Sequence, residues 1–364
     1  SVRFGDGTEV TFTSTDSEEF QVNTYIQGHQ QQPSMAGLID GGYVVAWESH
    51  NQDGSGDGVF AQRYGASGEP LGDEFQVNTW TGNEQERAEV TGLENGGFFI
   101  TWQDSSGSNN QIGGGESWDV RGQLYNASGV AQGPEVLINT QTYNDQTAPE
   151  VTALADGGYV VTWHSRYQDT GSSDYGIYGQ RYDANGTPSG SEFRVNTYTS
   201  GEQTHPAVAS LSDGGFVITW QDNTSQDSDD TSGYGIRGQR YGSDGEVRGD
   251  EFSVNTWTSG NQYEVDVTGL DNGQFVVTWG DETTHANRPG TDTSGWGVFG
   301  QVFTTSNVEG EDAVSMSGDQ FQINSTTNST QSDAYVVTLT NGNFVAVWYN
   351  GNNNDIRAQV FNAD

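Results

Sequence analysis

Six short runs of β-branched, aromatic and small residues recur along the chain, and each run ends in a tryptophan. The fourth copy runs from Phe216 to Trp220 and follows an Asp-Gly-Gly turn at 213–215. The glycines suit a tight turn with positive φ, and the run after them is too short and too rich in β-formers for a helix. Each copy therefore predicts a turn that leads into a buried strand. The other runs end at Trp47, Trp102, Trp163, Trp279 and Trp348.

The repeated unit is longer than this one strand. The tryptophans recur at intervals of 55 to 69 residues, somewhat longer than the roughly 40–50 residues of known propeller blades. Each unit has room for four strands, named a to d in chain order. In the fourth unit we place them at 207–211, 216–220, 236–241 and 252–255. The longest unit contains an extra excursion between its c and d strands, at 304–319.

Side-chain amides occupy fixed positions in this repeat. The c strands carry Gln62, Gln123, Gln180, Gln239, Gln301 and Gln359. The d strands end at Asn23, Asn78, Asn139, Asn196, Asn255 and Asn324. A further glutamine follows each of these asparagines, at Gln30, Gln85, Gln146, Gln203, Gln262 and Gln331. Repeated amides predict a repeated hydrogen-bonding role, such as pinning a loop to the next blade.

The two ends of the chain complement each other. Residues 19–23 match a d strand with no a, b or c strand before it, and the chain ends after a c strand at 356–361. We therefore expect an all-β fold, a six-bladed β-propeller closed by an N-terminal strand at 20–23 that completes the last blade. The predicted domain spans 1–364, with an N-terminal extension at 1–18 and six repeats at 19–364.

The composition narrows the choice of partners. The chain has 12 basic residues, all arginine, against 50 acidic ones, a net charge of −38. Such a charge disfavours nucleic acid, anionic membranes and polyanionic substrates. Cysteine is absent, which excludes disulfides and thiolate metal sites. No stretch has the length of a membrane span, so membrane insertion is not expected.

Some units resemble repeats of a known family. Residues 158–163, 176–186 and 192–197 are similar to repeats in large secreted bacterial proteins, the RTX-type adhesins and multimodular calcium-binding exoproteins. The resemblance implies an extracellular location, secreted or at the cell surface. We also expect the protein to be a monomer or a module of a larger protein. The glycine-rich nonapeptides of true RTX repeats are absent from this sequence.

Acidic, Gly/Ser-rich loops between the b and c strands are candidate calcium sites, because Ca²⁺ prefers carboxylate and carbonyl oxygens. One loop, at 51–58, holds Asp53 and Asp57, and another, at 226–233, holds Asp227, Asp229 and Asp230. Neither loop has EF-hand spacing. The alternative is a solvated loop with Asx turns.

Aromatic residues gather on the face that carries the d–a and b–c loops. A ring beside acidic and amide side chains is what sugar recognition requires. The alternative is that these rings pack between blades. Those that follow the d-strand asparagine are Tyr25, Trp80, Tyr198 and Trp257, and those that precede the c strand are Trp118, Tyr175, Tyr234 and Trp296.

The start of each a strand should lie at the channel mouth, and there the repeat breaks down into different polar residues. Paired carboxylates would serve glycoside hydrolysis, and Tyr, His and Arg would serve β-elimination on a uronic acid. The alternative is a solvated channel mouth. The candidate catalytic residues are Arg87, Glu150, His205, Tyr263 and Asp266.

Two functions remain open from the sequence. The first is a secreted, lectin-like propeller module that binds a polysaccharide or a cell-surface glycan and is stabilised by calcium. The second is a polysaccharide-degrading enzyme, a lyase or a glycoside hydrolase, with its site at the channel mouth. The repeated aromatic residues favour binding, whereas the catalytic set depends on propeller geometry.

Overall fold

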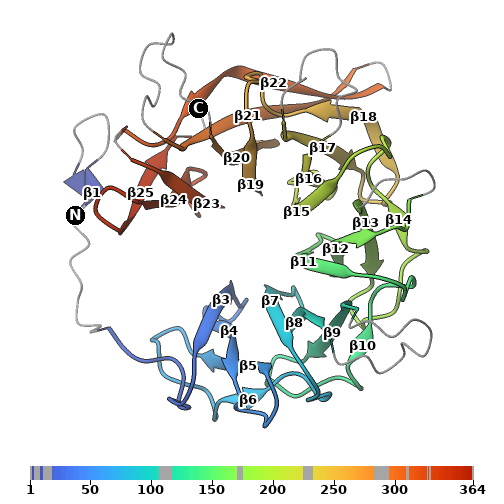
Figure 1. Ribbon diagram of the computed structural model, residues 1–364, viewed down its shortest axis with the longest axis vertical. Coiled ribbons are helices and arrows are strands. Elements are labelled where there is room, and N and C mark those ends of the chain that lie inside the picture. Colours follow the sequence, from blue (N-terminus) through green and yellow to red (C-terminus); the bar gives the residue numbers. More distant parts are fainter. Residues whose placement is uncertain are drawn as a thin grey trace. The chain divides into compact units, whose positions relative to one another are not determined.

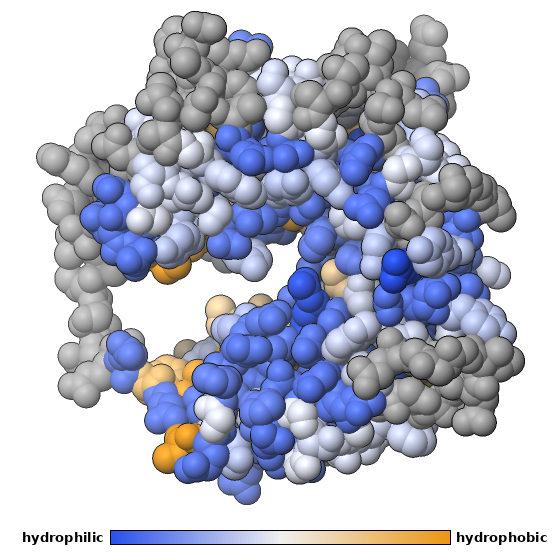
Figure 2. Space-filling view, in the orientation of Figure 1, coloured by the Kyte–Doolittle hydropathy of each residue, from blue (hydrophilic) through white to orange (hydrophobic). Residues whose placement is uncertain are grey.

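The computed structural model of the protein describes residues 2–3, 9–10, 19–105, 117–169, 175–223, 233–282, 295–308, 311–325, 327 and 329–362 (Figure 1). All regular elements in this part of the chain are β-strands, and it contains no helix with the length and hydropathy of a membrane span. The visible face in Figure 2 is largely hydrophilic, in keeping with the 50 acidic residues of the sequence.

The chain forms two compact units. The N-terminal unit comprises Phe20–Thr199, and the C-terminal unit comprises Ser200–Asp364 together with Ser1–Glu19. Each unit contains three antiparallel blades, numbered here in chain order, so the chain has the six blades that the sequence predicts. The fold class is that of an all-β, six-bladed β-propeller.

The N-terminal unit holds blades 1 to 3, each with four strands in sequential order. Blade 1 consists of β3 (Gln30–Gly37), β4 (Tyr43–His50), β5 (Asp57–Tyr64) and β6 (Phe75–Gln76). Blade 2 consists of β7 (Gln85–Gly92), β8 (Phe98–Asp104), β9 (Asp119–Tyr125) and β10 (Val136–Leu137). Blade 3 consists of β11 (Gln146–Ala153), β12 (Tyr159–Arg166), β13 (Tyr175–Tyr182) and β14 (Phe193–Arg194).

The C-terminal unit holds blades 4 to 6 and a short two-stranded sheet of β1 (Val2–Arg3) and β2 (Glu9–Val10). Blade 4 consists of β15 (Gln203–Ser210), β16 (Phe216–Asp222), β17 (Gly235–Tyr241) and β18 (Val247–Ser253). Blade 5 consists of β19 (Gln262–Gly269), β20 (Gln274–Asp281), β21 (Gly297–Val308) and β22 (Glu311–Gln322). Blade 6 consists of β23 (Gln331–Thr338), β24 (Phe344–Asn350) and β25 (Asp355–Phe361).

The extra excursion predicted at 304–319 is a hairpin. Strands β21 and β22 pair along their length as far as Val308 and Glu311. The long unit therefore extends a blade rather than adding an element.

The second strand of each blade carries the core. Trp102, Trp163, Trp220 and Trp279 are fully buried. Hydrophobic clusters form between the faces of successive blades, for example between Val44 and Ala46 of blade 1 and Val90 of blade 2. Burial on both faces explains why these strands read as continuous apolar runs instead of alternating ones.

The glycines of the repeated turn are required by the backbone. One glycine in each turn between the first two strands adopts a φ between 82° and 89°, a conformation that a Cβ disfavours. In blade 4 this residue is Gly214, and the Asp213 side chain accepts a hydrogen bond from the next backbone N–H at 2.9 Å. The sequence prediction of a glycine turn is confirmed.

The side-chain amides connect one blade to the next. Asn78, at the end of blade 1, donates from Nδ2 to Gln85 Oε1 at 2.9 Å, and Gln85 begins β7 of blade 2. Its Oδ1 accepts a hydrogen bond from the Val59 N–H at 2.9 Å. The strand-c glutamines act within their own blade, where Gln62 donates to the Gly72 carbonyl at 3.2 Å. The predicted pinning role is therefore confirmed for five Asn–Gln pairs, which are Asn23–Gln30, Asn78–Gln85, Asn139–Gln146, Asn255–Gln262 and Asn324–Gln331.

The N-terminal segment contacts blade 1 as a fourth strand contacts the following blade. Phe20 lies against Tyr64 with ring centroids 5.4 Å apart, and the pair Phe75–Tyr125 has the same arrangement at 5.3 Å. However, residues 20–23 form no regular strand, and blade 6 has three strands among the described residues. Pairing of 20–23 with 356–361 is absent from the described strand pairs, so closure by this segment remains a prediction.

Candidate functional site

The first strand of every blade carries a β-bulge at the position where the sequence repeat breaks down. One non-glycine residue in each bulge adopts a φ between 48° and 56°, which is uncommon for residues with a Cβ. Bulges of this kind re-aim side chains and are over-represented next to active sites. The six residues are Gln32, Arg87, Ala148, His205, Glu264 and Asp333.

The preceding blade holds the backbone of the bulge. In the N-terminal unit, Glu48 Oε1 accepts a hydrogen bond from the Arg87 N–H at 2.5 Å. Gln103 Oε1 accepts one from the Ala148 N–H at 3.1 Å. Each acceptor follows the repeated tryptophan of its second strand. Because the scaffold holds only the backbone here, the side chain of the bulge residue is free to vary.

Blade 5 departs from this arrangement because Gly280 stands where the other blades carry a side chain. Glu264, itself a bulge residue, supplies the missing acceptor: its Oε2 receives a hydrogen bond from the Asp333 N–H of β23 at 2.6 Å. A Cβ added to Gly280 would lie 3.3 Å from Glu264 Oε2 and 3.5 Å from Trp296 Cε3. Because Gly280 has no side chain, space remains next to Glu264 and Trp296.

Three aromatic rings form a ladder at this place. Tyr263 stacks on Trp296 with ring centroids 5.4 Å apart and an interplanar angle of 21°. The Tyr263 ring also lies 5.3 Å from the Tyr234 ring, tilted at 46°. The Tyr234 hydroxyl donates a hydrogen bond to Glu202, which fixes the first ring. We call Tyr234, Tyr263, Trp296, Glu264 and Asp333 the aromatic–carboxylate site.

The carboxyl groups of this region have perturbed pKa values. Burial raises the pKa of Glu264; the Asp333 N–H lowers it in part, and the negative charge of Asp333 raises it. Burial also raises the pKa of Asp266 to about 6. Asp266 accepts hydrogen bonds from the N–H groups of Val336, at 2.7 Å, and Val267, at 2.8 Å. It therefore links β19 to β23 beneath the site.

The structure brings some of the predicted catalytic residues together and separates others. Tyr263 and Asp266 both lie in β19, on either side of the Glu264 bulge. His205 is an exposed bulge residue of β15 in blade 4. Arg87 and Glu150 belong to blades 2 and 3 of the N-terminal unit. The five residues thus do not form one site within a single unit.

The predicted sugar-binding aromatics also divide. Tyr234 and Trp296 join Tyr263 in the ladder. Trp257 packs edge-on against Phe299 and the hydrophobic core of its unit, which supports the packing alternative for this ring.

The remaining five aromatics lie outside the ladder. Trp80 is half exposed beneath the Arg121 guanidinium, 5.7 Å from the ring centroid. Tyr175 lies edge-on to His164. Tyr198 is 37% exposed, and Tyr25 and Trp118 are half-buried. These rings remain candidates without a shared site.

The predicted calcium ligands fall in three places. Asp53 accepts hydrogen bonds from Asn78 Nδ2 at 3.2 Å and from the Ser55 N–H at 3.1 Å, the Asx-turn alternative. Asp57 lies with two other carboxylates, as described below. Asp227, Asp229 and Asp230 lie outside the described residues.

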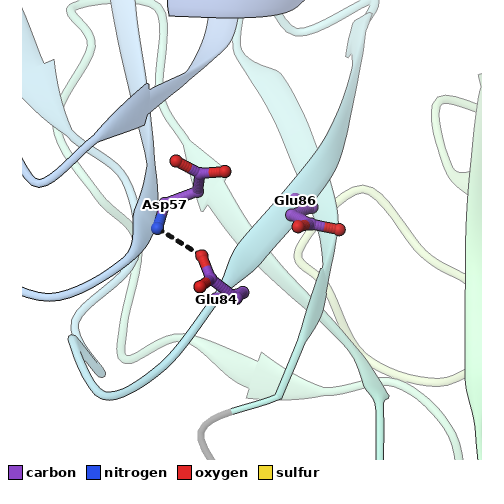
Figure 3. A group of neighbouring side chains, drawn as sticks. All are labelled: Asp57, Glu84 and Glu86. Atoms are coloured by element: carbon purple, nitrogen blue, oxygen red, sulfur yellow. Dashed lines mark hydrogen bonds between the residues drawn. The ribbon is translucent and has the colours of Figure 1, made fainter. Parts of the chain in front are cut away.

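Asp57 forms a carboxylate cluster with Glu84 and Glu86 in the N-terminal unit (Figure 3). One ligand atom from each residue lies within 4.8 Å of the others. The Asp57 N–H donates to Glu84 at 2.6 Å, and the His50 ring lies 2.7 Å from the Asp57 carboxylate. Three oxygen ligands suit a hard cation such as Ca²⁺. Calcium binding here remains a prediction.

Sequence reasoning missed Glu264 and Gly280. Both residues follow a residue of the internal repeat. Glu264 lies two positions after the repeated glutamine Gln262, and Gly280 directly follows the repeated tryptophan Trp279. Gly280 is the one glycine at a position that elsewhere holds Glu48, Gln103, His164, Gln221 and Tyr349. Comparing the residue after each tryptophan would have singled out blade 5.

No family model and no curated protein matches the chain. Solved structures are similar in fold. The α-L-arabinanase of Penicillium chrysogenum in complex with arabinobiose is 13% identical with a TM-score of 0.54, covering 93% of this chain and 95% of that one.

Two further solved structures share the fold. The α-L-arabinofuranosidase of Fusarium graminearum, bound to an iminosugar inhibitor, is 12% identical with a TM-score of 0.56 and covers 93% and 94% of the two chains. The intramolecular trans-sialidase of Ruminococcus gnavus is 9% identical with a TM-score of 0.57, covering 94% and 97%. At such identities the likeness shows the propeller fold alone.

Proposed function

We propose that the protein is a glycoside hydrolase whose active site is the aromatic–carboxylate site, with Glu264 as the general acid. The observation that carries the proposal is a half-buried carboxyl group with a raised pKa beside a stacked pair of rings. A general acid must hold its proton near the working pH, and burial of a carboxyl group is the usual means. Aromatic rings stack on the apolar face of a sugar.

Glycoside hydrolysis uses a second carboxylate, and we assign this role to Asp333. Asp333 is exposed, and its charge raises the pKa of Glu264, so the two groups interact electrostatically. Glycoside hydrolysis pairs a carboxyl group that holds a proton with a second carboxyl group. Asp266 acts as a positioning residue, because its carboxyl group accepts the backbone N–H of Val336 in β23.

The fold comparisons add support to this proposal. Two of the similar structures are arabinan-degrading enzymes with a sugar or an iminosugar bound, and a third is a trans-sialidase. Glycosidic bonds are thus cleaved by other proteins of this fold. The residues that do so here are proposed from this chain alone.

Glycan binding without cleavage is the second candidate function. The ladder of Tyr234, Tyr263 and Trp296 favours it, because stacked rings explain affinity without any catalytic step. A secreted, calcium-stabilised glycan-binding module would use the same rings. Hydrolysis requires Glu264 in addition, so the two functions differ in the role of one residue.

The test is release of reducing ends from a panel of polysaccharides by wild-type protein and by Glu264→Gln. Glutamine retains an acceptor for the Asp333 N–H but carries no acidic proton, so we expect kcat to fall about 10²–10⁴-fold with an unchanged Tm. Glu48→Gln is the matched control and should keep the turnover of folded protein. If wild-type protein binds a glycan and releases no product, hydrolysis is rejected and binding stands.

A further inference from the structure

We infer that the aromatic–carboxylate site accepts an uncharged glycan and rejects sugars that carry a carboxylate, an inference that rests on the proposed function. The argument comes from the charged groups around the ladder. They decide which substrates can reach the rings, whatever the rings themselves contribute to affinity.

The charged neighbours of the ladder are carboxylates. Glu202 accepts the Tyr234 hydroxyl proton in a hydrogen bond, and its negative charge adds to the burial that raises the pKa of Tyr234. The negative charge of Glu282 likewise adds to the burial that raises the pKa of Tyr263. Glu264 and Trp296 lie beside the same glycine, Gly280, and Glu264 in turn contacts Asp333, so four acidic side chains lie at or next to the ladder.

The described arginine side chains of the C-terminal unit are engaged with other carboxylates. Arg237 lies 3.0 Å from Asp222, Arg240 pairs with Asp213, Arg248 lies 3.0 Å from Asp312, and Arg357 lies 2.8 Å from Asp355. Recognition of a carboxylate commonly uses the bidentate fork of an arginine. Each of these forks already has an acidic partner.

Two neighbouring segments of the sequence add no net positive charge. The sequence at 224–232 contains Asp227, Asp229 and Asp230 and no basic residue. The sequence at 283–294 contains Arg288 and Asp292, which cancel in charge. Both segments lie outside the described residues.

The physical consequence is selection by charge. Sugar hydroxyls donate hydrogen bonds to carboxylates, so an uncharged sugar finds acceptors beside the rings. A uronate or a sialic acid brings a second negative charge against several fixed ones, and like charges at an interface are strongly unfavourable. The site therefore fits neutral polysaccharides of hydroxyl-bearing sugars.

The experiment compares matched glycans on the Glu264→Gln protein, which binds without turnover. The probes are carboxylated oligosaccharides together with neutral, carboxyl-reduced counterparts of the same backbone, such as native with carboxyl-reduced sialyllactose and native with carboxyl-reduced oligogalacturonate. We expect the carboxylated member of each bound pair to bind about tenfold more weakly at physiological ionic strength.

Two variants separate the site from the overall charge of −38. Glu282→Gln removes one charge beside the ladder and should narrow the difference between matched glycans. Asp271→Asn removes one exposed charge from the opposite end of the same blade and should leave the difference unchanged.

Each contrary result has its own meaning. Equal or tighter binding of a carboxylated glycan overturns the inference and leaves the proposed function standing. A difference that responds equally to both variants overturns its assignment to this site. Failure to bind any glycan overturns the proposed function, and the inference falls with it.

Discussion

Two junctions between blades perform the same structural task with different residues. Between blades 1 and 2, Glu48 of the second strand accepts the bulge N–H of Arg87. Between blades 5 and 6, the second strand offers Gly280, and Glu264 of the first strand accepts the bulge N–H of Asp333. Both junctions contain a hydrogen bond to the bulge N–H. Its acceptor comes from the second strand in one junction and from the first strand in the other.

The two acceptor carboxyl groups have different surroundings, and this difference changes what each group can do. Glu48 is fully buried, and its two oxygens accept hydrogen bonds from Gln31 Nε2 and the Arg87 N–H. Glu264 is half-buried and lies beside Trp296. Burial raises the pKa of both groups. A raised pKa alone therefore does not mark a catalytic residue, and access to a ligand distinguishes the two.

The largest expected effect is a loss of stability when the junction between blades 1 and 2 loses its hydrogen-bond acceptor. Glu48→Ala should lower the free energy of unfolding by about 3 kcal/mol, because it removes a fully buried side chain and leaves the Arg87 N–H, in a partly buried hydrogen bond, without its acceptor. Glu264→Ala should lower it by less than about 1 kcal/mol, because Asp333 is exposed and water can replace the acceptor. Urea denaturation of both variants measures the difference.

Equal losses of stability in the two variants would contradict this comparison. They would mean that Glu264 is as structural as Glu48 and that its place beside the rings is incidental. Glu48→Gln retains an acceptor and should recover most of the stability lost in Glu48→Ala.

The second prediction concerns the junction between blades 5 and 6 and the dependence of its stability on pH. The pKa of Asp266 is raised to about 6, above its ordinary value of 3.8. The folded state therefore favours the protonated form, and the stability that this supplies is present below about pH 4 and lost as the pH rises through about 6. Asp266→Asn removes this dependence. Its stability relative to wild type should rise by about 2 kcal/mol from pH 4 to pH 7.

Denaturant unfolding at intervals of one pH unit measures this gain. Asp271→Asn, in the exposed turn of the same blade, is the control and should show no such trend. A constant difference between Asp266→Asn and wild type across this range would show that burial does not perturb Asp266.

The smallest expected effect distinguishes a ring of the ladder, which should contribute to glycan affinity, from a ring of the core, which should contribute to stability. Trp296→Ala should weaken glycan binding by about 1–2 kcal/mol, because it removes one face of the stacked pair. Trp257→Ala should instead lower the Tm and leave the affinity of folded protein intact, because Trp257 packs against Phe299. Calorimetric titration with a bound oligosaccharide tests both variants. The reverse pattern would exchange their roles.

The sequence predicts the repeated parts of this fold well. The tryptophan strands, the glycine turns and the amide pairs were readable because each recurs with the same local spacing. The first strands were predicted too short, since β15 begins at Gln203 rather than near Ala207. The bulge interrupts the apolar pattern at that point, and its polar residues look like a loop in the sequence.

The site was predicted only in part, for a physical reason. The sequence indicates Tyr234, Tyr263 and Trp296 only as separate candidates, because the contacts between their rings join segments that are far apart in the sequence. The role of Glu264 depends on an absent side chain at Gly280 and on a backbone N–H in the next blade. Such relations are fixed by the packing of one blade against the next, which spacing along the chain does not reveal.

The most direct test of the central claim is a crystal structure of the Glu264→Gln protein with an oligosaccharide that the wild type binds. The account predicts one sugar ring stacked about 4 Å from Trp296 or Tyr263, with a glycosidic oxygen within hydrogen-bonding distance of residue 264. An oligosaccharide bound elsewhere, for example beside Asp57 and Glu86, with the ladder unoccupied, would contradict it.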